Sequence, residues 1–207
     1  MNFKMNNLLK YLIFFVFGLF TTPAYSLSSE WAIGDKSKVR LISPFSTSNN
    51  SNEIILGLEY KLDKDWKTYW KSPGGGGFPQ TLVWNNSSNI KDLKIEWPEP
   101  IEFEILGLPS IGYKDSVIFP LIIKLEDPEN ITDINLNVNY LVCKHICIPG
   151  NANIYLTIPP GQGQTTSHFF DIEKAKSNTS INNINLSSIK DFKLNIQKNS
   201  NNVFINI

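Results

Sequence analysis

The fold is decided by residues 133–158, which read Asp133-Ile-Asn-Leu-Asn-Val-Asn-Tyr140-Leu-Val-Cys143-Lys-His-Ile-Cys147-Ile-Pro-Gly150-Asn-Ala-Asn-Ile-Tyr-Leu-Thr-Ile158. Apolar side chains occupy every second position from Ile134 to Val142, with Asp133 and asparagines at most positions between them. A second alternation follows from Ile154 to Ile158 after Pro149-Gly150 interrupts the pattern. A period of two is typical of half-buried β-strands. The stretch therefore predicts two strands joined by a hairpin-like connection, with both cysteines at its tip or shoulder.

Further strand-like runs precede this hairpin. They cover residues 38–43, 53–62, 66–71, 81–84, 93–97 and 116–125. Turn-forming residues separate them, notably the Pro-Gly-Gly-Gly-Gly run at 73–77 and the Pro-Glu-Pro at 98–100. No stretch has a convincing helical periodicity. About eight short strands with regularly spaced turns predict an all-β fold, an antiparallel β-sandwich of immunoglobulin-like architecture.

The N-terminus has the pattern of a secretory signal. A short basic head containing Lys4 precedes an apolar run over residues 11–20, and small residues Ala24 and Ser26 stand where a signal peptidase requires them. We expect residues 1–26 to be a signal peptide cleaved after Ser26. The alternative is an uncleaved anchor, although ten apolar residues fall short of the roughly 20 that span a bilayer. The mature chain is expected to be soluble, exported and not membrane-spanning.

The mature chain divides into two parts. We expect one β-sandwich domain over residues 27–160, followed over 161–207 by a linker and the start of a second β-module, with a disordered tail as the alternative. Without Lys4 and Lys10, 17 basic residues stand against 19 acidic ones. This balance gives no electrostatic footprint for nucleic acid.

Cys143 and Cys147 are the two cysteines of the chain. In an exported protein such a close pair is either a small structural staple or a redox dithiol. Closing a loop of about five residues contributes only ~2 kcal/mol, against roughly 4.7 kcal/mol for a loop of about 100 residues. An extended segment would hold the two Cα atoms ~13 Å apart, whereas a disulfide requires less than about 7 Å. The pair must therefore lie on a turn when oxidised, and its small stabilising effect favours a redox role.

Three stretches carry a resemblance to a known family. They are 65–74 (Asp-Trp-Lys-Thr-Tyr-Trp-Lys-Ser-Pro-Gly), 111–115 (Ile-Gly-Tyr-Lys-Asp) and 140–149 (Tyr-Leu-Val-Cys-Lys-His-Ile-Cys-Ile-Pro). In this order they resemble the N-terminal periplasmic domain of the thiol:disulfide interchange protein DsbD and the related domains of ScsB-type copper-tolerance proteins. The resemblance extends from Leu58 to Pro159.

The resemblance implies electron relay by thiol–disulfide exchange, without a bound cofactor. The implied partners are a membrane-embedded thiol reductase, as a separate electron donor, and periplasmic thiol proteins. It implies that Cys147 forms the mixed disulfide and that Cys143 resolves it. It also places a cap loop with an aromatic residue at Phe103, and Tyr69 and Tyr113 are further candidates for the wall of the site.

Other readings of the cysteine motif stay open. Lys144 and His145 are candidates for lowering a thiolate pKa, or they form a solvated rim. In an extended segment Cys143, His145 and Cys147 would share one face and could bind a soft ion such as Cu(I). A third alternative is an adhesion or assembly module with an inert disulfide. The spacing of Trp66 and Trp70 places Tyr69 on the opposite face of its strand.

Overall fold

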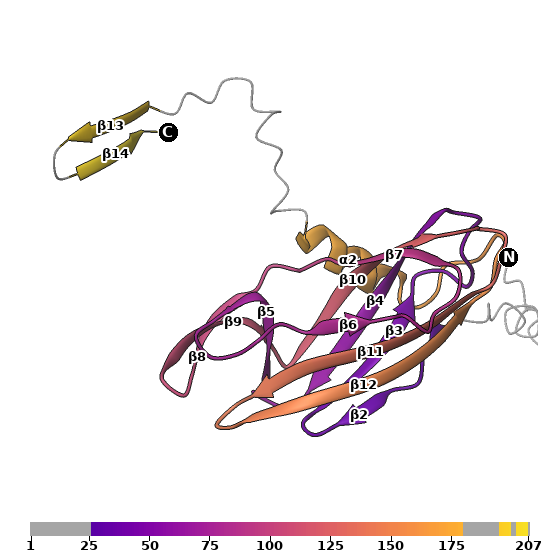
Figure 1. Ribbon diagram of the computed structural model, residues 1–207, viewed down its shortest axis with the longest axis horizontal. Coiled ribbons are helices and arrows are strands. Elements are labelled where there is room, and N and C mark those ends of the chain that lie inside the picture. Colours follow the sequence, from indigo (N-terminus) through magenta and orange to yellow (C-terminus); the bar gives the residue numbers. More distant parts are fainter. Residues whose placement is uncertain (1–25, 180–194, 200–201, 207) are drawn as a thin grey trace, which may run out of the picture.

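The computed structural model describes residues 26–179, 195–199 and 202–206. Its main body consists of two antiparallel sheets (Figure 1). The first sheet contains β1 (Leu27–Ser28), β2 (Ala32–Gly34), β3 (Ser37–Ser43), β4 (Glu53–Leu62), β10 (Ser116–Leu125) and β7 (Ile90–Ile95). The second contains β12 (Cys147–Ile158), β11 (Thr132–Cys143), β6 (Thr81–Val83), β5 (Lys67–Gly74), β9 (Leu108–Lys114) and β8 (Ile101–Ile105). The predicted antiparallel β-sandwich is confirmed.

The main hydrophobic core lies between the two sheets. The predicted face of β11 enters it, since Ile134, Leu136 and Val138 have no exposed surface. β4 and β10 supply the opposite wall and pair along their length, with Phe119 opposite Leu58. The predicted bounds of these two strands, 53–62 and 116–125, match the structure. The sequence thus predicted the strands that form both walls of the main core.

The segment expected as a cap loop is instead a β-hairpin. β8 pairs with β9, and Ile105 lies opposite Leu108 across a two-residue turn. Leu106 and Gly107 both have positive φ, 52° and 78°. Two such residues in succession are the requirement of the tight turn that suits the twist of paired strands. The segment around Phe103 is therefore held by a ladder of backbone hydrogen bonds at the edge of the second sheet.

The structure also contains a helix that the sequence analysis missed, α2 (Phe169–Thr179). Its buried residues are Ile172, Ala175 and Thr179, a spacing that follows one helix face. Only the first of them is large and apolar, so the amphipathic signal is weak. Gly57 lets the helix approach the first sheet, because a Cβ there would lie 3.1 Å from the Ile172 side chain.

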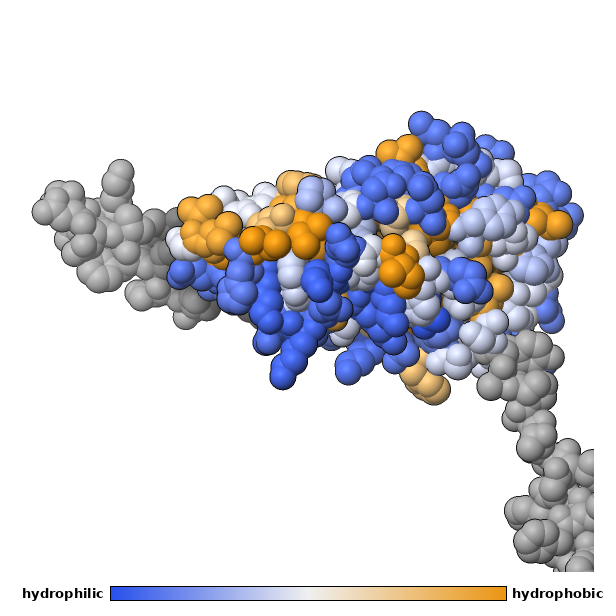
Figure 2. All heavy atoms as spheres, turned by 90° about the horizontal axis from the view of Figure 1, so that it is seen from below, coloured by the Kyte–Doolittle hydropathy of each residue, from blue (hydrophilic) through white to orange (hydrophobic). Residues whose placement is uncertain are grey.

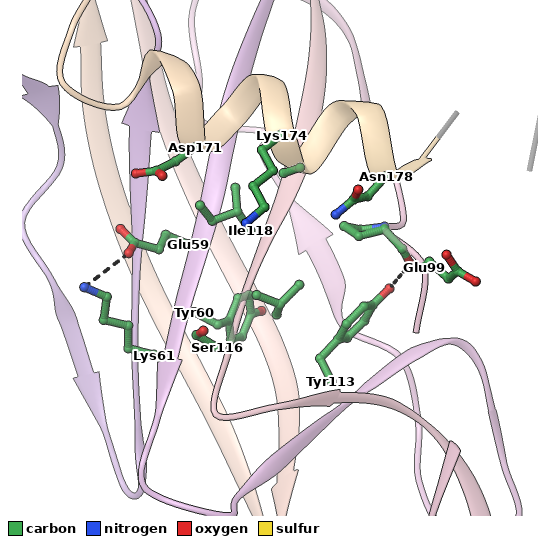
Figure 3. Close-up of a pocket in the computed structure, with 13 residues that line it drawn as sticks. Glu59, Tyr60, Lys61, Glu99, Tyr113, Ser116, Ile118, Asp171, Lys174 and Asn178 are labelled. Atoms are coloured by element: carbon green, nitrogen blue, oxygen red, sulfur yellow. Dashed lines mark hydrogen bonds and ion pairs between the residues drawn. The ribbon is translucent and has the colours of Figure 1, made fainter. Parts of the chain in front are cut away.

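α2 runs across the outer face of the first sheet, over β4 and β10 (Figures 1 and 3). A groove of about 430 Å³ lies between the helix and the sheet, with Asp171 and Lys174 on one side and Glu59 and Lys61 on the other. The charges along it alternate in sign, and Glu59 and Lys61 lie 3.4 Å apart. The helix thus belongs to the sandwich and covers one of its faces.

The C-terminal strands form a separate pair. β13 (Asn195–Asn199) and β14 (Asn202–Asn206) are antiparallel, in the region where the sequence predicted further strands. The domain boundary predicted after residue 160 falls before α2, which packs on the first sheet. A second β-module after α2 stays a prediction. The predicted signal peptide lies outside the described residues. Within the described ranges, no helix is long and apolar enough to span a membrane.

Ile172→Ala should lower the free energy of unfolding by about 2–5 kcal/mol, because it leaves a cavity between helix and sheet. The matched control is Phe170→Ala, since Phe170 lies on the same helix and is 81% exposed. We expect the control to stay within about 0.5 kcal/mol of the parent. Urea unfolding measures the free energy of unfolding of both variants. An equally small decrease in the two would show that α2 does not stabilise the sandwich.

Candidate functional site: the Cys143–Cys147 disulfide

Cys143 and Cys147 form a disulfide at the tip of the β11–β12 hairpin. They are the last pair in the register of the two strands, and their Cα atoms lie 4.2 Å apart. Within the turn, the Lys144 backbone N–H donates to the Ile146 carbonyl at 3.0 Å. The predicted turn between the cysteines is therefore confirmed.

The two sulfurs differ in their access to solvent. Cys143 has no exposed surface. It lies in the interior of the sheet, where β11 pairs with Lys67 of β5 on one side and with Cys147 of β12 on the other. Cys147 is only half-buried, and the neighbouring Ile146 is 61% exposed. A thiolate of another protein could therefore approach the disulfide through Cys147.

A second apolar cluster surrounds the disulfide. It consists of Tyr69, Ile105, Leu141 and Cys143, with Phe103 and Cys147 packed against it. It is distinct from the main core, to which Trp66 belongs and against which Trp70 packs. The prediction that Tyr69 faces away from these two tryptophans is confirmed. The disulfide thus has a small apolar environment of its own.

The hydroxyl of Tyr69 contacts the disulfide directly. It lies 3.0 Å from Cys143 Sγ and 4.0 Å from Cys147 Sγ, and its other partner is the Gly76 carbonyl at 2.8 Å. Burial raises the pKa of Tyr69, so the hydroxyl keeps its proton at neutral pH. The loop after β5 closes over the ring because Gly77 has no side chain: a Cβ there would lie 2.3 Å from a ring carbon.

Phe103 packs beside Tyr69 from the β8–β9 hairpin. Their ring centroids are 6.0 Å apart, and Lys67 Nζ lies 5.6 Å from the Phe103 centroid. Tyr113 does not join them. It is buried in the main core 5.0 Å from the ring of Phe119, and its hydroxyl donates to the Pro98 carbonyl at 2.7 Å (Figure 3). The expectation that Tyr113 contributes to the wall is wrong, because its ring points to the other face of β9.

Lys144 anchors the hairpin tip to a neighbouring turn. Its Nζ lies 3.6 Å from an Asp65 carboxylate oxygen and donates to the Lys64 carbonyl at 3.2 Å. Lys114, 2.6 Å from Asp65, is the main cause that lowers the pKa of this carboxyl, and Lys144 adds to it. His145 is exposed at the tip. A pKa role for Lys144 and His145 stays a prediction.

The copper alternative assumed an extended segment, and this geometry is absent. The chain turns between the cysteines, and the two sulfurs are bonded to each other. No group of three or more His, Cys, Asp or Glu side chains within the described part of the chain is arranged to hold a metal ion.

Sequence reasoning missed two parts of the site. Leu141 is apolar at a position of β11 where alternation calls for a polar residue, and this departure signals the second cluster. The glycine run after β5 was interpreted only as a turn, whereas Gly76 and Gly77 position Tyr69. The available signal was the run of four glycines at 74–77, which begins five residues after Tyr69.

These features define an antiparallel β-sandwich domain with a partly accessible disulfide at a hairpin tip. Comparison with protein families gives a match to the N-terminal domain of the thiol:disulfide interchange protein DsbD, over residues 38–159. The chain belongs to this family. The resemblance noted in the sequence is thereby confirmed.

Comparison with solved structures gives one that agrees with the fold. The N-terminal periplasmic domain of ScsB from Proteus mirabilis aligns with a TM-score of 0.60 and 24% identity, over 75% of this chain and 60% of that one. The chain thus spans less than two thirds of that domain. The N-terminal domain of DsbD from Neisseria meningitidis in the reduced form aligns with a TM-score of 0.31 and 8% identity, over 71% and 96% of the two chains. The immunoglobulin-like fold class is confirmed, and no curated protein matches the chain.

Phe103→Ala should increase the reactivity of the reduced cysteines toward a small alkylating reagent several-fold. Phe103 is only half-buried beside Tyr69, so its removal opens the cluster while the melting temperature changes little. The exposed Phe170 provides a control, and Phe170→Ala should leave the reactivity unchanged. Unchanged reactivity in Phe103→Ala would eliminate the capping role, and a large loss of stability would make Phe103 an ordinary core residue.

Proposed function

We propose that this protein is a periplasmic thiol–disulfide exchange protein that relays electrons from a membrane-embedded thiol reductase to periplasmic thiol proteins through Cys143 and Cys147. The observation that carries the proposal is the asymmetry of the disulfide. One sulfur is buried and contacts a hydroxyl donor, and the other is half-buried at a hairpin tip. Family membership supports the same reaction type.

Electrons in the proposed cycle pass only through the two cysteines and the thiols of the protein partners. A thiolate of the reduced donor attacks Cys147 Sγ, the bond between the cysteines breaks, and its electron pair leaves on Cys143. The second thiol of the donor then displaces Cys147, so the donor is oxidised and both cysteines are reduced. Toward the acceptor, the Cys147 thiolate attacks the acceptor's disulfide, and Cys143 resolves the mixed disulfide.

The surroundings of the disulfide suit contact with another protein. Exposed apolar side chains gather at this end of the sandwich, among them Leu106 and Leu108 of the β8–β9 hairpin and Ile146 of the tip, which are 68%, 45% and 61% exposed. Figure 2 shows hydrophobic side chains clustered at the end of the molecule where this hairpin lies. Exposed apolar patches of this kind commonly mark protein interaction sites.

The structural-staple alternative has less support. The disulfide closes the last pair of a twelve-residue ladder that backbone hydrogen bonds and the main core already hold. So short a loop adds only ~2 kcal/mol. A disulfide needed only for stability would gain more from joining distant segments of the chain.

Cys143→Ser should accumulate mixed disulfides with periplasmic partners, because Cys147 can still attack but no second thiol displaces the partner. Cys147→Ser should form none. Acid-quenched extracts separated on non-reducing gels measure the trapped species.

Both variants should fold, given the small contribution of the disulfide, and circular dichroism checks this. Equal trapping by the two variants would contradict the assigned roles. The absence of any trapped partner with Cys143→Ser would contradict the exchange function.

A further inference from the structure

We propose that Tyr69 is a catalytic residue of this exchange, whose hydroxyl moves its hydrogen bond from the Gly76 carbonyl to the departing Cys143 sulfur. The inference rests on the proposed function. In this proposal the Tyr69 hydroxyl determines that Cys143 Sγ, and not Cys147 Sγ, is the leaving sulfur. It follows from three distances around one hydroxyl group and from the burial of the ring that holds it.

The Tyr69 hydroxyl has one proton and two acceptors within reach. The Gly76 carbonyl lies at 2.8 Å and Cys143 Sγ at 3.0 Å. A neutral disulfide sulfur is a weak acceptor, whereas a thiolate is an anion, and hydrogen bonds to ionised groups are roughly twice as strong as neutral ones. The proton therefore favours the carbonyl while the disulfide is intact and favours Cys143 once that sulfur carries charge.

The same hydroxyl distinguishes the two cysteines. It lies 1 Å closer to Cys143 than to Cys147, at 3.0 Å against 4.0 Å. Within residues 26–179, the Tyr69 hydroxyl is the donor that reaches Cys143 Sγ. Burial without a donor would penalise a thiolate at Cys143. The hydroxyl offsets this penalty at Cys143, whereas Cys147 is the sulfur that an attacking thiolate can reach from solvent.

The ring is held in place, so that only the O–H bond has to turn during the reaction. Tyr69 has no exposed surface, and it packs with Ile105 and against Phe103. On the loop side, Gly77 lies so close that any side chain there would overlap the ring. Because the hydroxyl oxygen is in place before charge develops on Cys143, the stabilising hydrogen bond forms without any movement of the ring.

The attacking thiolate supplies an electron pair and forms a bond to Cys147 Sγ. The Cys143–Cys147 bond breaks, and its electron pair remains on Cys143 as a thiolate. The Tyr69 O–H hydrogen-bonds to that thiolate and keeps its proton, so no further reactant is required. In the reverse direction the same thiolate attacks Cys147 and expels the partner.

The test uses the full-length protein with Tyr69→Phe, which removes only the hydroxyl. Reduction of the disulfide by excess dithiothreitol, followed by acid quench and thiol alkylation, should slow roughly tenfold, as expected from losing a hydrogen bond to a charged group. Tyr113→Phe is the matched control, since its hydroxyl binds Pro98 in the main core and should leave the rate unchanged. In a Cys147→Ser background, thiolate absorbance should give a higher pKa for Cys143 when residue 69 is phenylalanine.

If the disulfide of Tyr69→Phe is reduced as fast as that of the parent, or faster, the inference is overturned. A faster rate is expected if the hydroxyl only holds the glycine loop in place, because its removal would then expose the disulfide. A fluorotyrosine incorporated at position 69 keeps the size and donates more strongly, so its rate should exceed the parent's. An unchanged or slower rate there would also count against the assignment. If Cys143→Ser traps partners while Tyr69→Phe reacts like the parent, only the role of Tyr69 fails and the exchange function stands.

Discussion

The register of the β11–β12 hairpin is the constraint on which the rest of the structure depends. Side chains at even positions from Ile134 to Val142 enter the main core, whereas Leu141 and Cys143 face the other way. A slip of one residue would exchange these faces. It would place Cys143 in the main core, beyond the reach of Tyr69. Packing of the main core thus determines on which face of β11 the Cys143 sulfur lies.

The sandwich separates stability from reactivity. The main core is built from both sheets and includes the buried aromatic pair Tyr60 and Phe119. The small cluster around Cys143 is separate from this core and is built from strands of the second sheet alone. Changes in the oxidation state of the cysteines can therefore alter the local cluster while the sheets persist. The lysine on the tip, Lys144, ties the hairpin to the Asp65 turn by contacts that do not involve the disulfide.

Much of the fold could be predicted from local patterns. Strand β11 was identified from its alternation, β4 and β10 were expected as strand-like runs, and the turn between the cysteines followed from Cα geometry. The β8–β9 hairpin was missed although Ile101, Phe103 and Ile105 alternate with two glutamates. The contact between Tyr69 and Cys143 joins residues 74 positions apart. Nothing local to either residue specifies it, since it depends on how β5 pairs with β11.

The reduction potential of the Cys143–Cys147 pair tests the central claim most directly. Equilibration of the full-length protein in dithiol buffers of known potential, with trapping of free thiols, measures it. A pair that exchanges electrons with thiol proteins should have a potential between about −270 and −120 mV, the range of known thiol–disulfide oxidoreductases. A potential well below about −300 mV is characteristic of structural disulfides. Such a value would contradict the relay and make the pair a staple at the end of a hairpin.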